Sequence, residues 1–359
     1  MSPRLAPRQV LPLLQTAGVD ITLTLTERRG HATEVASRLD LSSVDAVLVV
    51  SGDGLLCEVY NGLQAHAQHE LAAAMPLGIV PAGSGNAVAK SLAARAGEAC
   101  TPVNATLAAL CCTAPMPLDA ALVRQRGAPP IHALLSLSWA LVADVDIESE
   151  ALRALGPARF TVQALLRCAL LRRYAGRLLF LPSTSGAAAA AGRPATADEA
   201  ARAQSLDDGV PEPGGDEPSG WRVIDGPLEN VWALNLPWGG EDALAAPGAV
   251  ADDGCFDVVV FRGGSPMAVA AALMAFEKGE HVDHACVTVV KATAFVLEPG
   301  EPDSGGSGGG NIVLDGELVA RRGGKAAPAL PLSYAPIHVR VRRGAARMLA
   351  RRETATTLH

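Results

Sequence analysis

Ser51-Gly52-Asp53-Gly54 and Gly83-Ser84-Gly85-Asn86 are the two stretches that decide the fold of this chain. Each glycine-rich turn follows a continuous apolar run, residues 46–50 and 77–80, and precedes a helical pattern that begins near Leu55 or Asn86. Such runs are typical of parallel strands that are covered on both faces. Glycines let the backbone approach a phosphate closely, and helix N-termini add free N–H groups and the positive end of the helix dipole. The tandem arrangement predicts a polyphosphate site at one edge of a parallel sheet.

The other patterns predict two domains, one α/β and one β-rich. In residues 1–116, a helix over 8–16 and a strand over 20–26 precede the two strand-turn-helix units, which gives a doubly wound α/β nucleotide-binding domain. Residues 117–346 read as a sandwich-like domain of antiparallel strands with helices over 158–174 and 266–278. The strands are expected over 132–145, 177–181, 221–224, 231–236, 256–261, 288–290, 295–297 and 337–341.

Three segments are expected to lie outside these two cores. Residues 185–220 are rich in alanine, glycine, proline and acids and cannot bury enough apolar surface to offset chain entropy, so they are predicted to be a disordered insert. Residues 304–310 read as a short flexible spacer. Residues 347–359 are predicted to be a basic tail.

Charge is unevenly distributed along the chain. The 359 residues carry a net charge of −7, which argues against nucleic acid as a partner. Residues 185–220 contribute −5 and residues 298–310 contribute −3, which leaves the rest of the chain at about +1. From Arg340 onward, six arginines stand against one glutamate. This distribution permits contact with an anionic membrane surface.

Cysteine content and hydropathy indicate the compartment. The seven cysteines show neither Cys-x-x-Cys spacing nor a paired framework, so neither a zinc site nor a disulfide scaffold is indicated and a reducing compartment is expected. No apolar run reaches the roughly 18 residues of a membrane span, so a soluble protein is expected. The basic start of the chain reads as an ordinary helix. We therefore predict a cytoplasmic protein with peripheral membrane association, and leave open whether it forms a homodimer.

The glycine turns also carry a resemblance to a known family. Residues 51–63 and 81–87 resemble sphingosine kinases of the diacylglycerol-kinase-like lipid kinase superfamily, and the similarity continues through 135–139, 143–150, 159–161, 275–279 and 315–318. The Gly-Asp-Gly turn alone is shared with NAD kinases and phosphofructokinases, whereas segment 143–150 and the serine in the second turn favour sphingoid-base kinases. The resemblance implies transfer of the γ-phosphoryl group of ATP, with Mg²⁺, to the primary hydroxyl of a sphingoid base held by the β-rich domain.

Asp53 is the first candidate for catalysis. An aspartate at the apex of a glycine turn beside bound phosphates could accept the proton of an attacking hydroxyl, or orient that hydroxyl toward the γ-phosphorus. The alternative is that Asp53 only caps the helix that follows it. Glu58 lies one helical turn further and either supports the site or is a solvated helix residue.

Asp144 and Asp146 form the second candidate group. They lie two residues apart at the end of an expected strand, so their carboxylates are predicted on the same face, with Ser136 at an even spacing from both. Such a pair could hold the ammonium of a sphingoid base beside the hydroxyl that is phosphorylated. A polar strand end is the alternative, and the resemblance favours Asp146 as the head-group ligand.

The resemblance implies further site residues. The apolar stripe on the helix after residue 158 would cover the lipid chain, with Phe160 and Phe295 lining its tunnel. By itself, Asp315-Gly316-Glu317 reads as a hairpin turn. Arginine suits phosphate recognition because its planar donors bind two oxygens at once. The nucleotide would contact Thr26, Ser51, Gly52, Gly54, Gly83, Ser84, Gly85, Asn86, Arg153, Arg159, Asp315, Gly316 and Glu317.

The sequence departs from the family at its start. Sphingosine kinases open this domain with a strand and a glycine-rich loop that carries an Asn-Pro pair, whereas the resemblance here begins in the helix after that loop. We therefore expect weaker ATP binding and an open sheet edge. A diacylglycerol or ceramide kinase and a catalytically impaired, lipid-binding regulatory homologue are the alternatives to an active sphingoid-base kinase.

Overall fold

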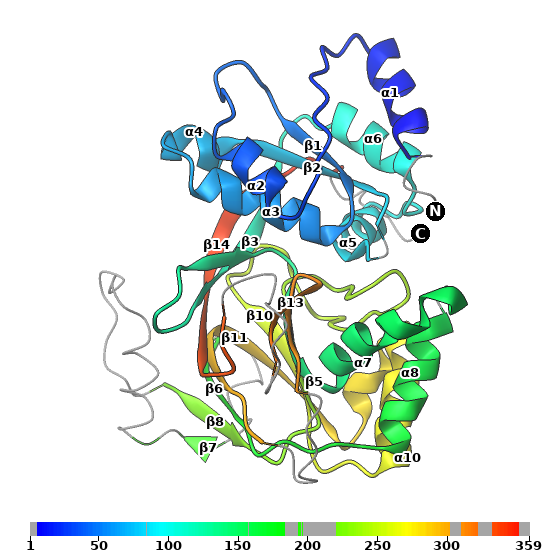
Figure 1. Ribbon diagram of the computed structural model, residues 1–359, viewed down its shortest axis with the longest axis vertical. Coiled ribbons are helices and arrows are strands. Elements are labelled where there is room, and N and C mark those ends of the chain that lie inside the picture. The colour runs from blue at the N-terminus through cyan, green and yellow to red at the C-terminus, as the bar shows by residue number, and fades with distance from the viewer. Residues whose placement is uncertain are drawn as a thin grey trace, which may run out of the picture.

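The protein consists of an α/β part and a β-rich part, which lie one above the other in Figure 1. The computed structural model describes residues 6–83, 85–156, 158–183, 193–194, 196, 220–301, 310–321 and 332–351. The expected combination of an α/β domain with a β-rich domain is confirmed. Within the described residues, no helix is both long enough and apolar enough to cross a bilayer.

The α/β part contains the two predicted strand-turn-helix units. Strands β1 (Val47–Ser51) and β2 (Pro76–Pro81) pair in parallel, and each is followed at its C-terminal end by a helix, α3 (Asp53–Gln64) or α5 (Ala87–Arg95). The other helices are α1 (Ala6–Thr16), α2 (His31–Ala36), α4 (His69–Ala74) and α6 (Pro102–Leu110). Parallel pairing brings both glycine turns to one edge of the sheet, as the sequence predicts.

The strand predicted over residues 20–26 is wrong. These residues run without regular structure, and the side chains of Leu23 and Leu25 are 60% and 74% exposed. In the described part of the chain β1 pairs only with β2, so no neighbour supplies hydrogen bonds to residues 20–26. A β-branched segment becomes a strand only when such a neighbour exists.

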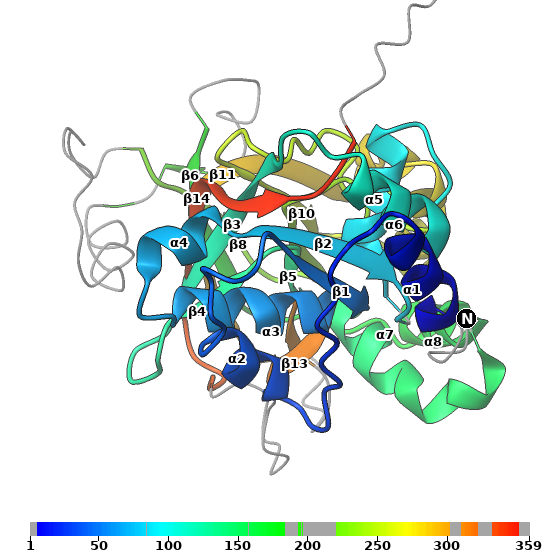
Figure 2. The same ribbon diagram turned by 90° about the horizontal axis from the view of Figure 1, so that it is seen from above.

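Strand β14 (Ile337–Met348) connects the two parts into one sheet. Its first half pairs with β11 (Val287–Glu298), and β3 (Met116–Arg124) runs antiparallel along most of its length. Its last residues, Arg347 and Met348, pair in parallel with Pro76 and Leu77 of β2, and Figure 2 shows β14 beside β2. The expected boundary at residue 116 and the expected tail from residue 347 stay predictions; β3 and β14 cross from one part to the other, and Arg347 and Met348 belong to β14. Residues 352–359 of that tail lie outside the described residues.

The β-rich part is antiparallel around a central meander. The sheet runs β14, β11, β10 (Phe256–Phe261), β9 (Asn230–Leu234), β5 (Ser136–Ala140), β12 (Ile312–Leu314) and β13 (Glu317–Ala320), while β4 (Ile131–Ala133) pairs with β3 and β6 (Arg177–Pro182) pairs with β11. The predicted strands over 288–290 and 295–297 are both part of β11. Most of the predicted insert 185–220 lies outside the described residues, but Arg193–Pro194 forms the short strand β7 against β8 (Arg222–Asp225), so this pair is ordered.

The strand predicted over 132–145 ends early. At Ala140, where φ is 72°, the chain leaves β5 and enters α7 (Leu141–Ser149), whose first turn is held by a hydrogen bond of 3.0 Å from the Val142 N–H to Asn230 Oδ1. An apolar run of this length is equally compatible with a buried helix. Asp144 and Asp146 therefore lie on a helix, and the expectation that they share one face of a strand with Ser136 is wrong.

Five further helical segments are described in the β-rich part. The 3-10 segment η1 (Glu150–Leu155) leads from α7 to α8 (Ala158–Ala169), and α10 (Pro266–Met274) packs beside α8. The short turns η3 (Ala275–Glu277) and η4 (Glu280–Asp283) follow α10. The predicted helices over 158–174 and 266–278 are thus present, with earlier C-terminal ends.

Candidate active site

The two glycine turns lie in direct contact. A Cβ atom on Gly83 would lie 2.5 Å from Gly52 Cα, and one on Gly52 would lie 2.6 Å from the carbonyl oxygen of Gly85. Neither position leaves room for any side chain, so the two backbones can approach only because both residues are glycine. Ser51 ends β1, and its carbonyl accepts the Ala82 N–H, whereas Ser84 lies outside the described residues.

Asp53 links the two turns through its carboxylate. Its side chain is only 8% exposed, and its oxygens accept the backbone N–H groups of Ala87 at 2.8 Å and Val88 at 3.0 Å, which belong to the first turn of α5. Burial raises the pKa of Asp53 to about 6, although these two hydrogen bonds act against the rise. Asp53 therefore does cap a helix, as the alternative interpretation predicts. The helix that it caps is α5, and not α3, which follows it in the sequence. An ionised carboxylate has about four acceptor positions, so it can still receive a proton.

Asn86 closes the second turn on itself. Its Oδ1 accepts the Gly83 N–H at 3.0 Å, and its Nδ2 donates to the Gly83 carbonyl at 3.0 Å. The side chain is 3% exposed. Because Asn86 also precedes the first residue of α5, it sets where that helix begins relative to Asp53.

Asp315 and Gly316 form the two-residue turn of the hairpin between β12 and β13. Both have positive φ, 47° and 80°, as two-residue hairpin turns of type I′ require. The Asp315 carboxylate is buried and accepts three backbone N–H groups, from Leu134 at 2.7 Å, Leu135 at 2.9 Å and Ser136 at 2.8 Å. The predicted nucleotide contact of this carboxylate therefore needs correction, because it holds the start of β5, including Ser136.

Glu317 turns from the same hairpin toward the first glycine turn. Its Oε1 lies 3.0 Å from the position that a Cβ on Gly54 would take, and its other oxygen pairs closely with Arg29. Burial raises the pKa of Glu317, and the charge of Arg29 opposes this rise. The sequence interpretation missed Arg29. The only signal for it is an arginine pair directly before Gly30, close to the exposed Thr26.

Glu58 fixes the segment that carries Arg29. Its Oε1 accepts the Gly30 N–H at 2.9 Å, and its backbone carbonyl accepts the Thr33 hydroxyl at 2.9 Å. Glu58 thus orients the loop before α2 against α3. Glu58 is therefore not a freely solvated helix residue, and the supporting role predicted for it stays a prediction.

The Asp144 carboxylate accepts four hydrogen bonds from other residues of the protein. It accepts the N–H of Gly310 at 3.1 Å, the N–H and Nδ2 of Asn311 at 2.9 and 2.8 Å, and the Tyr174 hydroxyl at 2.9 Å. The side chain is 1% exposed, and burial raises its pKa. Asp144 therefore ties α7 to the start of β12 and is not available to a substrate ammonium.

Asp146, two residues later on α7, is in the opposite situation. Its carboxylate makes no hydrogen bond within the part of the chain that the structure describes, and it is partly exposed. Burial raises its pKa to about 6, the charge of Arg159 lowers it, and the charges of Glu150 and Glu317 raise it. The Asp146 carboxylate can therefore still accept hydrogen bonds. It interacts electrostatically with Glu317, the hairpin residue that lies near Gly54.

Arg159 lies at the start of α8, beside Asp146. It is buried, pairs closely with Glu150, and stacks over the ring of Phe160 with 4.4 Å between the guanidinium carbon and the ring centroid. Arg153, the other arginine predicted to bind phosphate, lies in η1, and its side chain is outside the described residues. The structure thus places Arg159 close enough to Asp146 for its charge to lower the pKa of that carboxylate.

The predicted lipid-lining residues do not lie together. Phe295 is completely buried in the main core of the β-rich part, whereas Phe160 lies at the start of α8. The apolar stripe is exposed at Val162, Leu165 and Leu166 of α8 and at Leu170 directly after that helix, with exposed fractions of 39 to 67%. The expectation that this stripe covers a lipid tunnel is therefore not met in this conformation.

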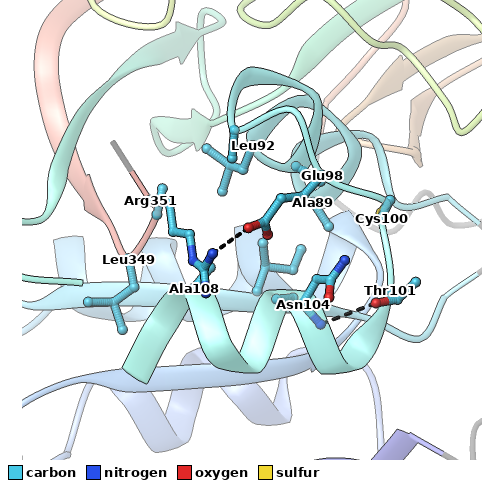
Figure 3. Close-up of a pocket in the computed structure, with 14 residues that line it drawn as sticks. Ala89, Leu92, Glu98, Cys100, Thr101, Asn104, Ala108, Leu349 and Arg351 are labelled. Atoms are coloured by element: carbon cyan, nitrogen blue, oxygen red, sulfur yellow. Dashed lines mark hydrogen bonds and ion pairs between the residues drawn. The ribbon is translucent and has the colours of Figure 1, made fainter. Parts of the chain in front are cut away.

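A cavity lies between α5, α6 and the residues that follow β14, and Figure 3 shows Arg351 and Glu98 facing each other in it. Apolar side chains such as Ile79 and Leu92 line it, and Arg351 reaches Glu98 at 2.5 Å across it. None of the predicted site residues contributes to its lining. Within the described residues, no group of three or more potential metal ligands is present.

Comparisons with known proteins agree with this arrangement. Residues 2–118 match the diacylglycerol kinase catalytic domain family, and residues 225–341 match the YegS C-terminal NAD kinase beta sandwich-like domain family. Among solved structures, a putative diacylglycerol kinase from Bacillus anthracis has a similar fold, with a TM-score of 0.58 and 18% identity over 97% of this chain and 92% of that chain.

Two curated relatives cover most of both domains. Sphingosine kinase 1 of Arabidopsis thaliana is 36% identical over 355 residues, which is 95% of this chain and 71% of that protein. Sphingosine kinase 1 of Homo sapiens is 37% identical over 322 residues, which is 86% of this chain and 80% of that protein. Since these matches extend through both parts of the fold, the chain belongs to the sphingosine kinase family.

Proposed function

We propose that the protein is an ATP-dependent kinase that phosphorylates the primary hydroxyl of sphingoid bases. The observation that carries this proposal is the contrast between Asp144 and Asp146: the Asp144 carboxylate accepts four hydrogen bonds from protein donors, whereas the Asp146 carboxylate accepts none within the described residues and interacts with the charges of Arg159 and Glu317. An unsaturated, partly buried carboxylate fits an ammonium group, which sphingoid bases carry next to the reacting hydroxyl.

The residues of this site have different roles in phosphoryl transfer. The glycine turns and the N-terminus of α5 offer the close approach and positive potential that phosphates need. Asp53 takes the proton of the hydroxyl as its oxygen attacks the γ-phosphorus of ATP, and the bond from that phosphorus to the bridging oxygen of ADP breaks. Asp146 holds the ammonium, so that the neighbouring hydroxyl faces Asp53.

Magnesium fits this site only together with the nucleotide. The carboxylates of Asp53 and Asp315 already accept backbone donors, which leaves Glu317 as the acid nearest to the first turn. Mg²⁺ is commonly held by one or two carboxylates and substrate phosphates, so Glu317 is the residue that would hold it. When bound, the ion would neutralise charge on the phosphates.

Removing the charge of Asp146 should impair the reaction with a sphingoid base specifically. A hydrogen bond to a charged group is worth about 1.5 to 3 kcal/mol, so Asp146→Asn should lower kcat/KM for sphingosine roughly 10- to 150-fold. An N-acylated analogue lacks the ammonium and should be a poor substrate for both proteins, with little further loss in the variant. Equal losses on both substrates, measured with labelled ATP, would remove Asp146 from the head-group site.

The pH profile provides a second readout of the same prediction. Asp53 and Asp146 both have a pKa of about 6 and both must be ionised in the free enzyme. The logarithm of kcat/KM should therefore fall with a slope approaching 2 as the pH drops below about 6, and stay level above it. In Asp146→Asn the slope should decrease to 1, because only Asp53 still titrates. An unchanged slope in the variant contradicts the assignment.

A membrane surface is the proposed source of the lipid substrate, and α8 with α10 is the proposed contact. Leu165 and Leu166 of α8 are 53 and 51% exposed, Leu170 directly after α8 is 67% exposed, and Met267 and Met274 of the neighbouring α10 are 84 and 75% exposed. Exposed apolar side chains on neighbouring helices can be buried at a bilayer interface. The cytoplasm remains the proposed location.

Mutation of this surface tests the membrane proposal. Burying one leucine contributes about 1.5 to 3 kcal/mol, so the double variant Leu166→Ser/Leu170→Ser should reduce binding to phosphatidylserine-containing vesicles at least about 10-fold in a sedimentation assay. Leu23→Ser/Leu25→Ser is the matched control, because these leucines are equally exposed but lie in the α/β part. Similar losses in both variants, or none in the first, would contradict a docking surface on α8.

The regulatory alternative makes a different prediction in the same assays. An impaired homologue would bind vesicles but would not transfer phosphate to sphingosine, diacylglycerol or ceramide. Phosphorylation of diacylglycerol or ceramide without phosphorylation of a free sphingoid base would instead replace the substrate assignment. Light scattering on the same preparation decides whether the protein is a monomer or the homodimer that the sequence left open.

A further inference from the structure

The second glycine turn is held from outside its own domain. The 236–246 loop, which follows β9 in the β-rich part, reaches α5 through three contacts. Glu241 Oε1 accepts a hydrogen bond of 2.7 Å from Asn86 Nδ2, the Trp238 N–H donates to Ser91 Oγ at 3.3 Å, and Lys90 Nζ lies 4.5 Å above the centre of the Trp238 ring. All three partners lie within the first turns of α5 or directly before it.

The 236–246 loop is itself tightly fixed. The Gly239 N–H donates to the Ala243 carbonyl at 2.9 Å, and a side chain on Gly239 would overlap the Trp232 ring. Further along, the Leu244 N–H donates to the Phe276 carbonyl at 2.8 Å, and His281 Nε2 lies 2.9 Å from the Ala245 carbonyl. The loop is therefore a firm support between η3, η4 and α5.

Asn86 connects Glu241 to the groups that hold Asp53. Asn86 closes the turn with both of its side-chain hydrogen bonds to Gly83, and the next two residues of the chain, Ala87 and Val88, donate to the Asp53 carboxylate. The second bond from Asn86 Nδ2, to Glu241, reinforces this orientation of the amide, because only the nitrogen side can donate. A shift of Asn86 would therefore move the donors that hold Asp53.

We infer that Glu241 is a positioning residue for phosphoryl transfer, acting through Asn86 on the donors that orient the Asp53 carboxylate. This inference rests on the proposed kinase function. Glu241 itself touches neither the nucleotide nor the lipid in this role. It makes the geometry of the α/β site depend on a loop of the β-rich part, so the two domains must be correctly docked before Asp53 is in place.

Three variants of the full chain test the inference. Glu241→Ala removes the acceptor and should lower kcat with sphingosine about 10-fold, the effect of losing one hydrogen bond to a charged group, with KM for sphingosine unchanged. Glu241→Gln keeps an acceptor oxygen and should stay within about 2-fold of the parent. Asp242→Ala removes a neighbouring exposed charge from the same loop and should also stay within about 2-fold.

Amide hydrogen exchange at Ala87 and Val88 supplies a readout that does not depend on activity. In Glu241→Ala these two amides should exchange about 10-fold faster, and in Glu241→Gln at the parent rate. If the parent does not phosphorylate sphingosine, the kinase proposal fails while the exchange experiment still decides the positioning role. Unchanged exchange in Glu241→Ala, equal losses in the alanine and glutamine variants, or tighter ATP binding in both would overturn the inference. The last result would show that Glu241 repels the phosphates.

Discussion

Asp53→Asn should lower kcat by about 100- to 10,000-fold, the range that a positioned general base contributes. The variant loses the proton acceptor at the point where the two glycine turns meet. It also replaces one acceptor oxygen by an NH₂ group that faces a backbone N–H of Ala87 or Val88, so α5 should lose about 1 to 3 kcal/mol of support. Single-turnover measurements with labelled ATP and sphingosine give the rate of the chemical step.

Thermal unfolding and nucleotide binding separate the two effects of this substitution. The variant should unfold at a lower temperature yet remain folded at 25 °C, and calorimetry should still detect ATP. A kcat within about 10-fold of the parent, with the same fall in rate below pH 6, would mean that the proton is accepted elsewhere. In that case the carboxylate of Asp53 serves only as the cap of α5.

Gly54→Asp should abolish measurable nucleotide binding, with a loss of at least about 100-fold in affinity, which corresponds to about 2.7 kcal/mol. A Cβ at this position points to Glu317 Oε1 at 3.0 Å, so the added carboxylate would stand beside an existing one. Both negative charges would then face the place where phosphates approach the first turn. Calorimetric titration with ATP in the presence of Mg²⁺ measures the loss.

Gly54→Ala is the matched control for this variant. It adds the same Cβ without charge, and the neighbouring atom is the end of a flexible glutamate side chain that can move by a few tenths of an ångström. Its affinity for ATP should stay within about 3-fold of the parent. Equal affinities for the alanine and aspartate variants would place the phosphates away from the first glycine turn.

The sequence predicts the α/β site well where the signal is local. The runs before Ser51 and Gly83 are strands because they are continuous, β-branched and followed by glycine, and these features need no knowledge of distant residues. The same holds for the Asp315-Gly316 hairpin turn. The hydrogen bonds of the Asp315 carboxylate were not predictable, because their donors belong to residues about 180 positions away in the sequence.

The failures of prediction have two physical causes. The run before Asp144 is apolar enough for a strand or a buried helix, and only the turn at Ala140 and the cap from Asn230 decide for α7. Residues 20–26 have strand composition, but a strand also requires a hydrogen-bonding neighbour. Glu241 and Arg29 were missed for a related reason, since exposed charges in loops give no sequence signal until the fold brings them to a glycine turn.

The course of β14 has a consequence for how the protein is made. The strand that completes the parallel sheet beside β2 is translated more than 250 residues after it. A nascent chain that has exposed both glycine turns therefore still lacks this neighbour of β2, and the nucleotide site cannot mature until the β-rich part has emerged. Such long-range closure slows folding and exposes an unpaired strand edge during synthesis. A chain released before residue 347 would leave the ribosome with that edge still open.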